Sequence, residues 1–335
     1  MSRISHVAQT QRPPQRGVTL LELLVVIFIA VLLAAAATRL MRPALENSQV
    51  REAGRILSTM LGTARTQAME SRRSAGIIFI PSKTNANAAM DLAYVQVPPP
   101  YAGDSLDSRI RIKTAPAPVA ASNPPAAVFT VEFPQADAWT TQVALGNTLQ
   151  FNHQGHVFRV DAIDTSDAAN PKLTLSCPTI ARWPQQTATG DPGMTFQFSR
   201  SPKRGSGVPV QLPLGSVVDL LASGVGDGSF VPNNTQPVMV TFSPSGQLDM
   251  VYSPAFPQGQ KVSQNVYFLV GRPEGAGNSD NLKDLRSVWV SIVCQSGLVG
   301  IAENAKVGAG SPDVSLPADR KSARRLAATG TSMGG

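Results

Sequence analysis

The sequence predicts an α+β protein in which one long N-terminal helix packs on an antiparallel β-sheet domain with an enlarged middle region. Two observations predict this class. Helical periodicity occupies residues 18–75, whereas short apolar runs with period two extend from residue 76 to 304. In addition, 27 glycines and 27 prolines among 335 residues suit many short strands joined by turns.

The first 40 residues have the pattern of a membrane anchor. Residues 1–17 form a basic leader with three arginines and no acid. Residues 18–40 begin with a 20-residue apolar run, 18–37, that Glu22 alone interrupts with a charge. A helix of that length spans about 30 Å, the thickness of a bilayer core. The sequence therefore predicts a transmembrane helix with a cytoplasmic N-terminus and the later domain on the far side of the membrane.

Three interpretations of this segment compete. It has the basic and apolar regions of a cleaved secretory signal, with small residues at Ala34–Ala37 for cleavage. It also suits a plain anchor. The third interpretation starts from Glu22, because a carboxylate inside a membrane helix costs about 2.5–3.5 kcal/mol and usually marks a function with a partner. A cut after Gly17 would create such a partner, the free α-amino group of this chain or of a neighbouring chain.

Residues 16–22, Arg-Gly-Val-Thr-Leu-Leu-Glu, resemble the processing site of type IV prepilins and type II secretion pseudopilins. That family is cut after the glycine, methylated on the new N-terminus and assembled through the acidic residue. The resemblance implies cleavage between Gly17 and Val18, methylation of Val18, and assembly roles for Glu22 and Thr19. It also implies three partners: a prepilin peptidase/methyltransferase, other pilins or pseudopilins, and the bacterial inner membrane. Val18 departs from the family, which more often has phenylalanine there.

Residues 41–75 are predicted to continue the helix as an amphipathic half. From Ala53 to Ala68 the apolar side chains recur every three or four residues, which gives the helix one face for a sheet to cover. Pro43 lies at the junction of the two halves. It either kinks the helix there or marks the end of the membrane span.

Residues 76–304 are predicted to form a β-rich periplasmic domain. Turn residues at 243–246 and 295–297 each join two apolar runs as a hairpin. The expected strands lie at 76–80, 92–97, 109–113, 128–133, 148–151, 157–160, 172–176, 195–198, 208–212, 238–242, 248–252, 266–270, 288–293 and 298–302.

The end of the helix and parts of this domain are similar to H-type minor pseudopilins and FimT-like minor pilins. The similarity lies in residues 64–68, 76–80, 240–248 and 289–301. It implies a minor component that primes or tips a type II secretion pseudopilus or a type IV pilus. Residues 81–235 are longer than such a protein needs, so this region is expected to be enlarged or inserted and to hold any lineage-specific role.

The sequence contains few residues of the kinds that form catalytic or metal-binding sites in other proteins. It therefore predicts that the protein is not an enzyme and has no metal site and no cofactor. His153 and His156 lack a third ligand at a recognisable spacing, which favours exposed turn residues. Residues 224–228 are glycine-rich without the lysine of a phosphate-binding loop. Asp280, Asn281 and Asp284 do not follow the order of a calcium-binding EF-hand loop.

Two features of the exported part leave alternatives open. Cys177 and Cys294 either form a disulfide, which an oxidising compartment permits, or remain two buried thiols. Residues 305–335 are predicted to be a disordered basic tail. Its cluster of Arg320, Lys321, Arg324 and Arg325 is either solvated or contacts nucleic-acid phosphates. The resemblance to FimT-like pilins, some of which bind DNA, makes a binding module for DNA or another extracellular ligand the alternative function.

Overall fold

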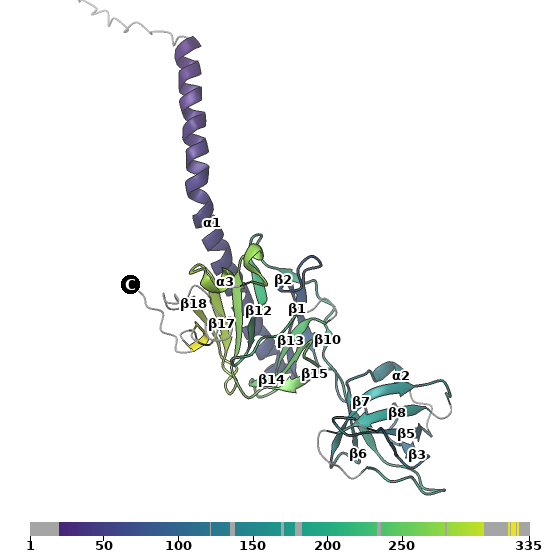
Figure 1. Cartoon of the computed structure of the whole chain (residues 1–335). Coiled ribbons are helices and arrows are strands. Elements are labelled where there is room, and N and C mark those ends of the chain that lie inside the picture. Colours follow the sequence, from purple (N-terminus) through teal and green to yellow (C-terminus); the bar gives the residue numbers. More distant parts are fainter. Residues whose placement is uncertain are drawn as a thin grey trace, which may run out of the picture. The chain divides into compact units, whose positions relative to one another are not determined.

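The computed structural model has two compact units, residues 1–48 and 49–335 (Figure 1). The structure describes residues 20–120, 122–134, 138–168, 171–177, 183–232, 236–278, 280–304, 321, 323–325 and 327, with the backbone alone for 35–46 and 258. The elements are α1 (Leu20–Ser71), β1 (Ala75–Pro81), β2 (Ala88–Gln96), β3 (Arg111–Ile112), β4 (Ala117–Pro118), β5 (Ala126–Glu132), α2 (Trp139–Gln142), β6 (Thr148–Phe151), β7 (Val157–Asp164), β8 (Lys172–Ser176), β9 (Phe196–Ser199), β10 (Lys203–Arg204), β11 (Val210–Gln211), β12 (Val217–Val225), β13 (Val238–Phe242), β14 (Leu248–Ser253), β15 (Phe256–Lys261), β16 (Val266–Gly271), the 3₁₀ turn η1 (Pro273–Gly275), α3 (Asp280–Lys283), β17 (Val288–Ile292) and β18 (Val299–Glu303).

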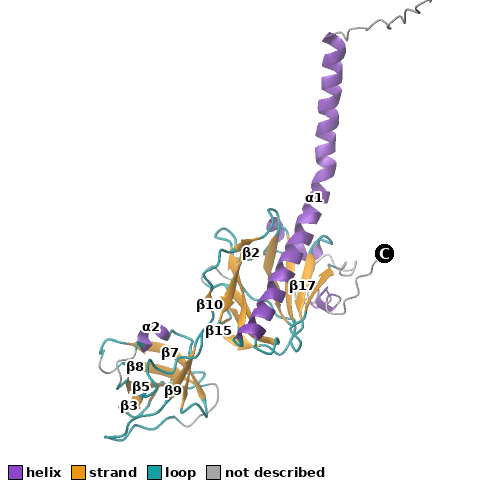
Figure 2. Ribbon diagram, turned by 180° about the vertical axis from the view of Figure 1, so that it is seen from behind, coloured by secondary structure: helices purple, strands orange, loops and turns teal. Residues whose placement is uncertain are grey.

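The predicted α+β class is confirmed, because one N-terminal helix precedes two antiparallel sheets. Helix α1 has 52 residues, and Pro43 lies within its range. Its second half starts the larger compact unit, and Figure 2 shows this half lying across one face of the first sheet.

The first sheet has eleven strands in the order β15-β14-β13-β1-β2-β12-β16-β17-β18, with β10 and β11 also paired to β2. Its strand pairs are antiparallel, and β1 lies between β2 and β13. The two hairpins predicted from turn residues are present, since β13 pairs with β14 and β17 pairs with β18. Residues far apart in the chain, such as Gly76 and Thr241, are therefore direct neighbours.

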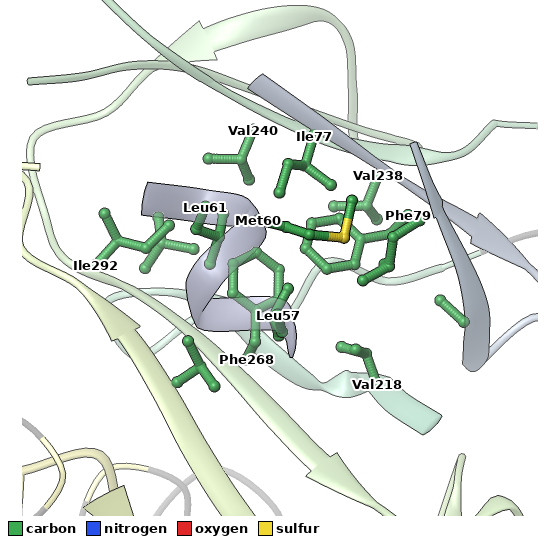
Figure 3. Packing of buried hydrophobic residues seen from close by; sticks show 14 of the residues in the cluster. Leu57, Met60, Leu61, Ile77, Phe79, Val218, Val238, Val240, Phe268 and Ile292 are labelled. Atoms are coloured by element: carbon green, nitrogen blue, oxygen red, sulfur yellow. The ribbon is translucent and has the colours of Figure 1, made fainter. Parts of the chain in front are cut away.

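The main core lies between α1 and the first sheet. Leu57 and Leu61 are fully buried on the helix, and Met60 lies beside them. Figure 3 shows these three side chains pointing among Phe79, Phe268 and other apolar residues of the sheet. The rings of Phe79 and Phe268 are stacked, with centroids 4.4 Å apart. The three-to-four-residue spacing of the helix and the period of two in the strands thus meet in one apolar layer.

The opposite face of the first sheet carries a smaller core. All six residues of β16 are buried, because alternate side chains enter the two cores. Tyr267 and Leu269 join Trp289 of β17 on the second face, together with Leu282 of α3. Two alanines of the C-terminal segment, Ala323 and Ala327, complete this cluster.

The second sheet has seven strands, with the path β3-β5-β8-β7-β6-β9 and β4 paired to β5. All seven strands lie in the chain between β2 and β10, and the sheet has its own core, rich in aromatic residues. Its chain segment falls within the range 81–235 that the sequence marked as enlarged. However, β2 and β10 to β12 also fall in that range, and they pair in the first sheet.

Candidate functional site

The N-terminal part of α1 is an apolar surface with one acidic residue. Gly17, Val18 and Thr19, the expected processing and assembly residues, lie outside the described residues. Glu22 lies in the first turn of α1 and is exposed. The twelve large apolar side chains from Leu20 to Leu33 are 45–85% exposed, and they occur on every side of the helix. The described residues include no helix that meets the length and hydropathy of a membrane span.

The second half of α1 is fixed to the first sheet by polar contacts at both ends. Near its C-terminal end, Arg65 Nε donates a hydrogen bond to the carbonyl oxygen of Gly246 at 3.0 Å. Gly246 has a φ of +81° in the β13–β14 hairpin, a conformation that favours glycine. Nearer the other end, Arg51 Nη2 lies 2.6 Å from Glu303 Oε1 on β18. That ion pair is exposed, so it contributes little to stability.

A buried carboxylate joins β12 to α3. Asp219 Oδ1 accepts backbone hydrogen bonds from Leu221 and Ala222 at 3.1 and 3.0 Å. Its Oδ2 accepts a hydrogen bond from Asn281 Nδ2 at 3.1 Å. Asn281 also accepts from the backbone N–H of Arg272 through Oδ1, at 2.9 Å. These bonds hold α3 against β12 and the end of β16.

Two of the three residues considered for calcium at α3, Asn281 and Asp284, have side chains that contact neighbouring residues. The side chain of Asn281 is occupied by Asp219 and by the backbone of Arg272. Asp284 accepts from Arg272 Nη2 at 2.8 Å and from Arg286 Nε at 3.0 Å. Among the described residues there is no group of three His, Cys, Asp or Glu side chains that could hold a metal ion.

The two carboxyl groups of this network have opposite pKa shifts. Burial raises the pKa of Asp219 above its usual value, although its hydrogen bonds oppose that change. Burial alone would also raise the pKa of Asp284, but hydrogen bonds from Arg286 and Arg272 outweigh it and leave the pKa lowered. Asp219 therefore favours folding most when it is protonated, and Asp284 when it is ionised.

We expect Asp219 to make the folded domain more stable as the pH falls through its raised folded pKa towards its unfolded pKa of 3.8. The folded state binds this proton more tightly than the unfolded state, so the stabilisation is complete below the unfolded pKa of 3.8 and is lost as pH rises through the folded pKa. Asp284 acts in the opposite direction and only below 3.8. Unfolding by denaturant at several pH values should show this slope in the wild type and a flatter one in Asp219→Asn. Equal slopes in the two proteins would contradict the assignment.

The two cysteines are not joined by a disulfide. Cys177 is buried in the core of the second sheet. Cys294 packs against the core of the first sheet, and its Sγ lies 3.2 Å from the carbonyl oxygen of Val262. The bridge that the sequence left open is therefore absent, because the two side chains belong to different cores.

The two histidines lie in a turn, and the glycine-rich stretch forms a loop whose carbonyl oxygens accept hydrogen bonds. His153 has a φ of +55° in the turn after β6, and its Nδ1 lies 3.0 Å from Gln197 Oε1. His156 is exposed in the same turn. The loop at 224–228 directs the carbonyl oxygens of Gly226 and Gly228 towards a guanidinium group. Such a loop attracts a cation, which is the opposite of a phosphate-binding loop.

The C-terminal cluster corrects the prediction of a solvated basic tail. Lys321, Arg324 and Arg325 lie in helical backbone, while Arg320 lies outside the described residues. Arg324 is only 2% exposed, so it is not available to a nucleic acid. Lys321 Nζ lies 3.0 Å from Asp227 Oδ2, and Arg325 is exposed. The prediction of a solvated side chain is wrong for Arg324, because the buried alanines at 323 and 327 give this segment an apolar side.

Comparison with known proteins supports one part of the chain. Residues 12–38 match the family described as the prokaryotic N-terminal methylation motif. This range includes Gly17, Val18, Thr19 and Glu22. No curated protein and no solved structure matches the chain.

The matched motif defines the class of the N-terminal segment. It implies a type IV pilin-like protein that prepilin peptidase processes and that interacts with other pilins. It suggests anchoring of the N-terminal region in the inner membrane. Proteins with this motif have structural rather than catalytic roles.

Proposed function

We propose that the chain is a minor pilin or pseudopilin, cut between Gly17 and Val18, methylated on Val18 and assembled into a type II secretion pseudopilus or a type IV pilus as a tip or priming component. The observation that carries this proposal is the surface of α1 from Leu20 to Leu33. Twelve large apolar side chains are exposed there around a single carboxylate, Glu22. Such a surface in water is unfavourable, so lipid or neighbouring helices must cover it.

Lipid and neighbouring helices contact this apolar surface at two stages of filament assembly. In the membrane, lipid surrounds the apolar side chains and the span 18–40 anchors the chain in a single pass. In the filament, helices of neighbouring subunits replace the lipid. Glu22 then meets the α-amino group of a neighbouring subunit, and Thr19, three residues before it in the sequence, takes part in the same assembly contact. The resulting charge pair sets the axial position of one subunit against the next.

The amphipathic half of α1 is suited to carrying the sheet domain. Its apolar side packs against the first sheet and is buried. Its charged side, with Glu52 and Arg55, is exposed. The domain therefore follows the helix when the subunit moves from membrane to filament. The H-type pseudopilin or FimT-like subtype is part of the proposal, and it rests on the hairpins β13–β14 and β17–β18 beside the end of α1.

The DNA-binding alternative loses support, because Arg324 is buried and Lys321 pairs with Asp227. A gel-shift titration with increasing salt tests what is left of it. We expect no difference in DNA binding between the whole chain and a variant lacking residues 318–335. A clear loss of salt-sensitive binding in that variant would restore the alternative.

The topology of the proposal predicts a specific pattern of protease sensitivity. In cells with an intact outer membrane, the domain from residue 49 onward should resist added protease. In spheroplasts it should be digested, because it lies on the periplasmic side of the inner membrane. A cytoplasmic protein followed in the same samples controls for lysis. Digestion of the domain only after the inner membrane is broken would contradict the proposed topology.

A further inference from the structure

Arg324 occupies a site on the first sheet that has the form of a receptor for a guanidinium group. Its Nη1 donates to the carbonyl oxygens of Gly226 and Gly228 at 2.6 and 2.8 Å. Its Nη2 donates to the carbonyl oxygen of Ala222 at 2.6 Å. The guanidinium carbon also lies 5.5 Å from the ring centre of Tyr267 and 5.7 Å from that of Trp289. Three carbonyl oxygens and two aromatic faces stabilise one buried cation.

Glycine residues build the carbonyl side of this site. A side chain at Gly224 would overlap the carbonyl group of Gly228, so the turn that follows β12 closes more tightly than other residues permit. Gly226 has a φ of +54°, and a side chain there would overlap Gln264. The turn is closed by a hydrogen bond from Gly228 N to the carbonyl oxygen of Val225 at 2.8 Å. The acceptors are therefore held in place by the local backbone.

The aromatic side of the site is equally fixed. Tyr267 and Trp289 lie on the neighbouring strands β16 and β17, with their rings almost perpendicular at 89°. Trp289 Nε1 donates to Asn304 Oδ1 at 2.9 Å, which fixes the indole ring. A planar guanidinium group can donate hydrogen bonds to carbonyl oxygens from both of its Nη atoms and still lie near two rings. A lysine ammonium group cannot do both. The site thus selects arginine over lysine.

The residues around Arg324 match the surface beside the site. One turn earlier, Lys321 Nζ pairs with Asp227 of the same loop at 3.0 Å. Ala323 and Ala327 are buried in the cluster that contains Trp289 and Leu282. The site therefore binds a short helical segment that has a lysine, an arginine three residues later and small residues on its apolar side.

The connection to this segment is much longer than its end points require. The described sheet ends at Asn304, which binds Trp289, and the C-terminal segment contacts the same tryptophan through Arg324. The 16 residues 305–320 lie between these points. A chain of that length can extend over about 50 Å. A connection that starts and ends at one side chain needs only a fraction of this reach, so its length permits the segment to bind another molecule.

We propose that this face of the first sheet is a receptor for the arginine-bearing C-terminal segment, and that a second copy of the chain supplies the segment when two copies lie side by side. In a single copy the chain fills its own site. In an assembly, the exchanged segment links neighbouring sheet domains through the same contacts that it makes within a single copy. This link is independent of prepilin processing and of Glu22, since it needs only two copies within reach.

A binding experiment tests the receptor. The receptor is the chain ending at residue 316, purified in detergent, and the probe is a fluorescent peptide of residues 317–335. We expect binding, with at least about tenfold weaker binding of an Arg324→Lys peptide. An Arg325→Lys peptide is the matched control and should bind like the wild type, because Arg325 is exposed. The whole chain should bind the probe more weakly than the shortened chain, since its own segment competes.

Two results would overturn the receptor assignment: a folded shortened chain that does not bind the peptide, or equal binding of the Arg324→Lys peptide. Circular dichroism establishes that the receptor is folded. If the shortened chain does not fold, the whole chain carrying Arg324→Lys replaces it, because its own segment is held more weakly and the probe can displace it.

A mixed pair tests the exchange itself. The acceptor ends at residue 316, and the donor carries Gly226→Ala, which disturbs its own site, with an intact C-terminal segment. We expect the two differently tagged chains to co-purify, and the yield to fall several-fold when the donor also carries Arg324→Lys. A yield that does not depend on Arg324, together with peptide binding in the first experiment, would show that the site is filled only within one chain and would overturn the exchange.

Discussion

Replacing Glu22 by alanine is expected to reduce incorporation into the filament by at least about tenfold, while membrane insertion and cleavage after Gly17 continue. The carboxylate is unfavourable in an apolar helix, by about 2.5–3.5 kcal/mol, so its removal makes the membrane form no less stable. In the filament the same change leaves the α-amino group of a neighbouring subunit without its partner. The measurement compares the sheared filament fraction with the membrane fraction for each variant.

Glu52→Ala is the matched control for Glu22→Ala. Glu52 lies on the same helix, its side chain is 53% exposed, and its ion pair with Arg55 at 3.7 Å contributes little. This variant should enter the filament like the wild type. Normal incorporation of the Glu22→Ala chain would show that the acid has no role in assembly.

Replacing Gly76 by alanine is expected to destabilise the first sheet by more than about 4 kcal/mol, which is a large part of the stability of a domain. Gly76 lies in β1, between β2 and β13. A Cβ atom there would overlap the carbonyl group of Val240 and lie 2.7 Å from the Cα of Thr241. Both obstacles are backbone atoms of a central strand, so no side-chain rotation relieves them. Thermal unfolding followed by circular dichroism measures the loss.

The same helix-and-sheet unit offers a control for the glycine change. Gly62 lies in α1, and a Cβ atom there would have nothing within 4 Å. Gly62→Ala should therefore stabilise the helix by roughly 0.5–1 kcal/mol, since alanine loses less conformational entropy. Unfolding of Gly76→Ala at the wild-type temperature would contradict the close approach of β1 and β13.

Elements with a regular period were predictable from sequence. The boundaries of β6, β8 and β13 agree with the predicted runs, and the apolar side of α1 from Ala53 to Ala68 is the buried one. These elements obey a simple rule, because one face meets a core and the other does not. The processing site and the assembly residue Glu22 were predicted from a motif, and comparison supports that motif at residues 12–38.

Elements that break the period were missed. Strand β12 has Asp219 buried as its third residue, where the carboxylate binds backbone N–H groups and the register with β16 begins to shift. No strand was predicted at residues 217–225, where this acid interrupts the apolar run. Strand β15 contains a proline and a glycine, Pro257 and Gly259, and it lies at the edge of the sheet, where such residues are tolerated. Neither strand has a signal that periodicity alone can detect.

The receptor for Arg324 was missed for a different reason. Its parts come from β12, β16, β17 and the C-terminal segment, and they become neighbours only through tertiary pairing. In the sequence, Arg324 is one of four basic residues in a short cluster, and nothing local distinguishes it from Arg325. The alanines at 323 and 327 are the one local signal, since with Arg324 they place small residues on one side of a helix.

The most direct test of the central claim is the intact mass of the protein purified from bacterial membranes. Processing as a prepilin predicts a chain that lacks residues 1–17, begins at Val18 and carries one added methyl group. A chain that begins after Ala37 would instead identify a secretory signal, and an uncut chain beginning at Met1 would identify a plain anchor. Either of these masses would contradict a pilin-like function.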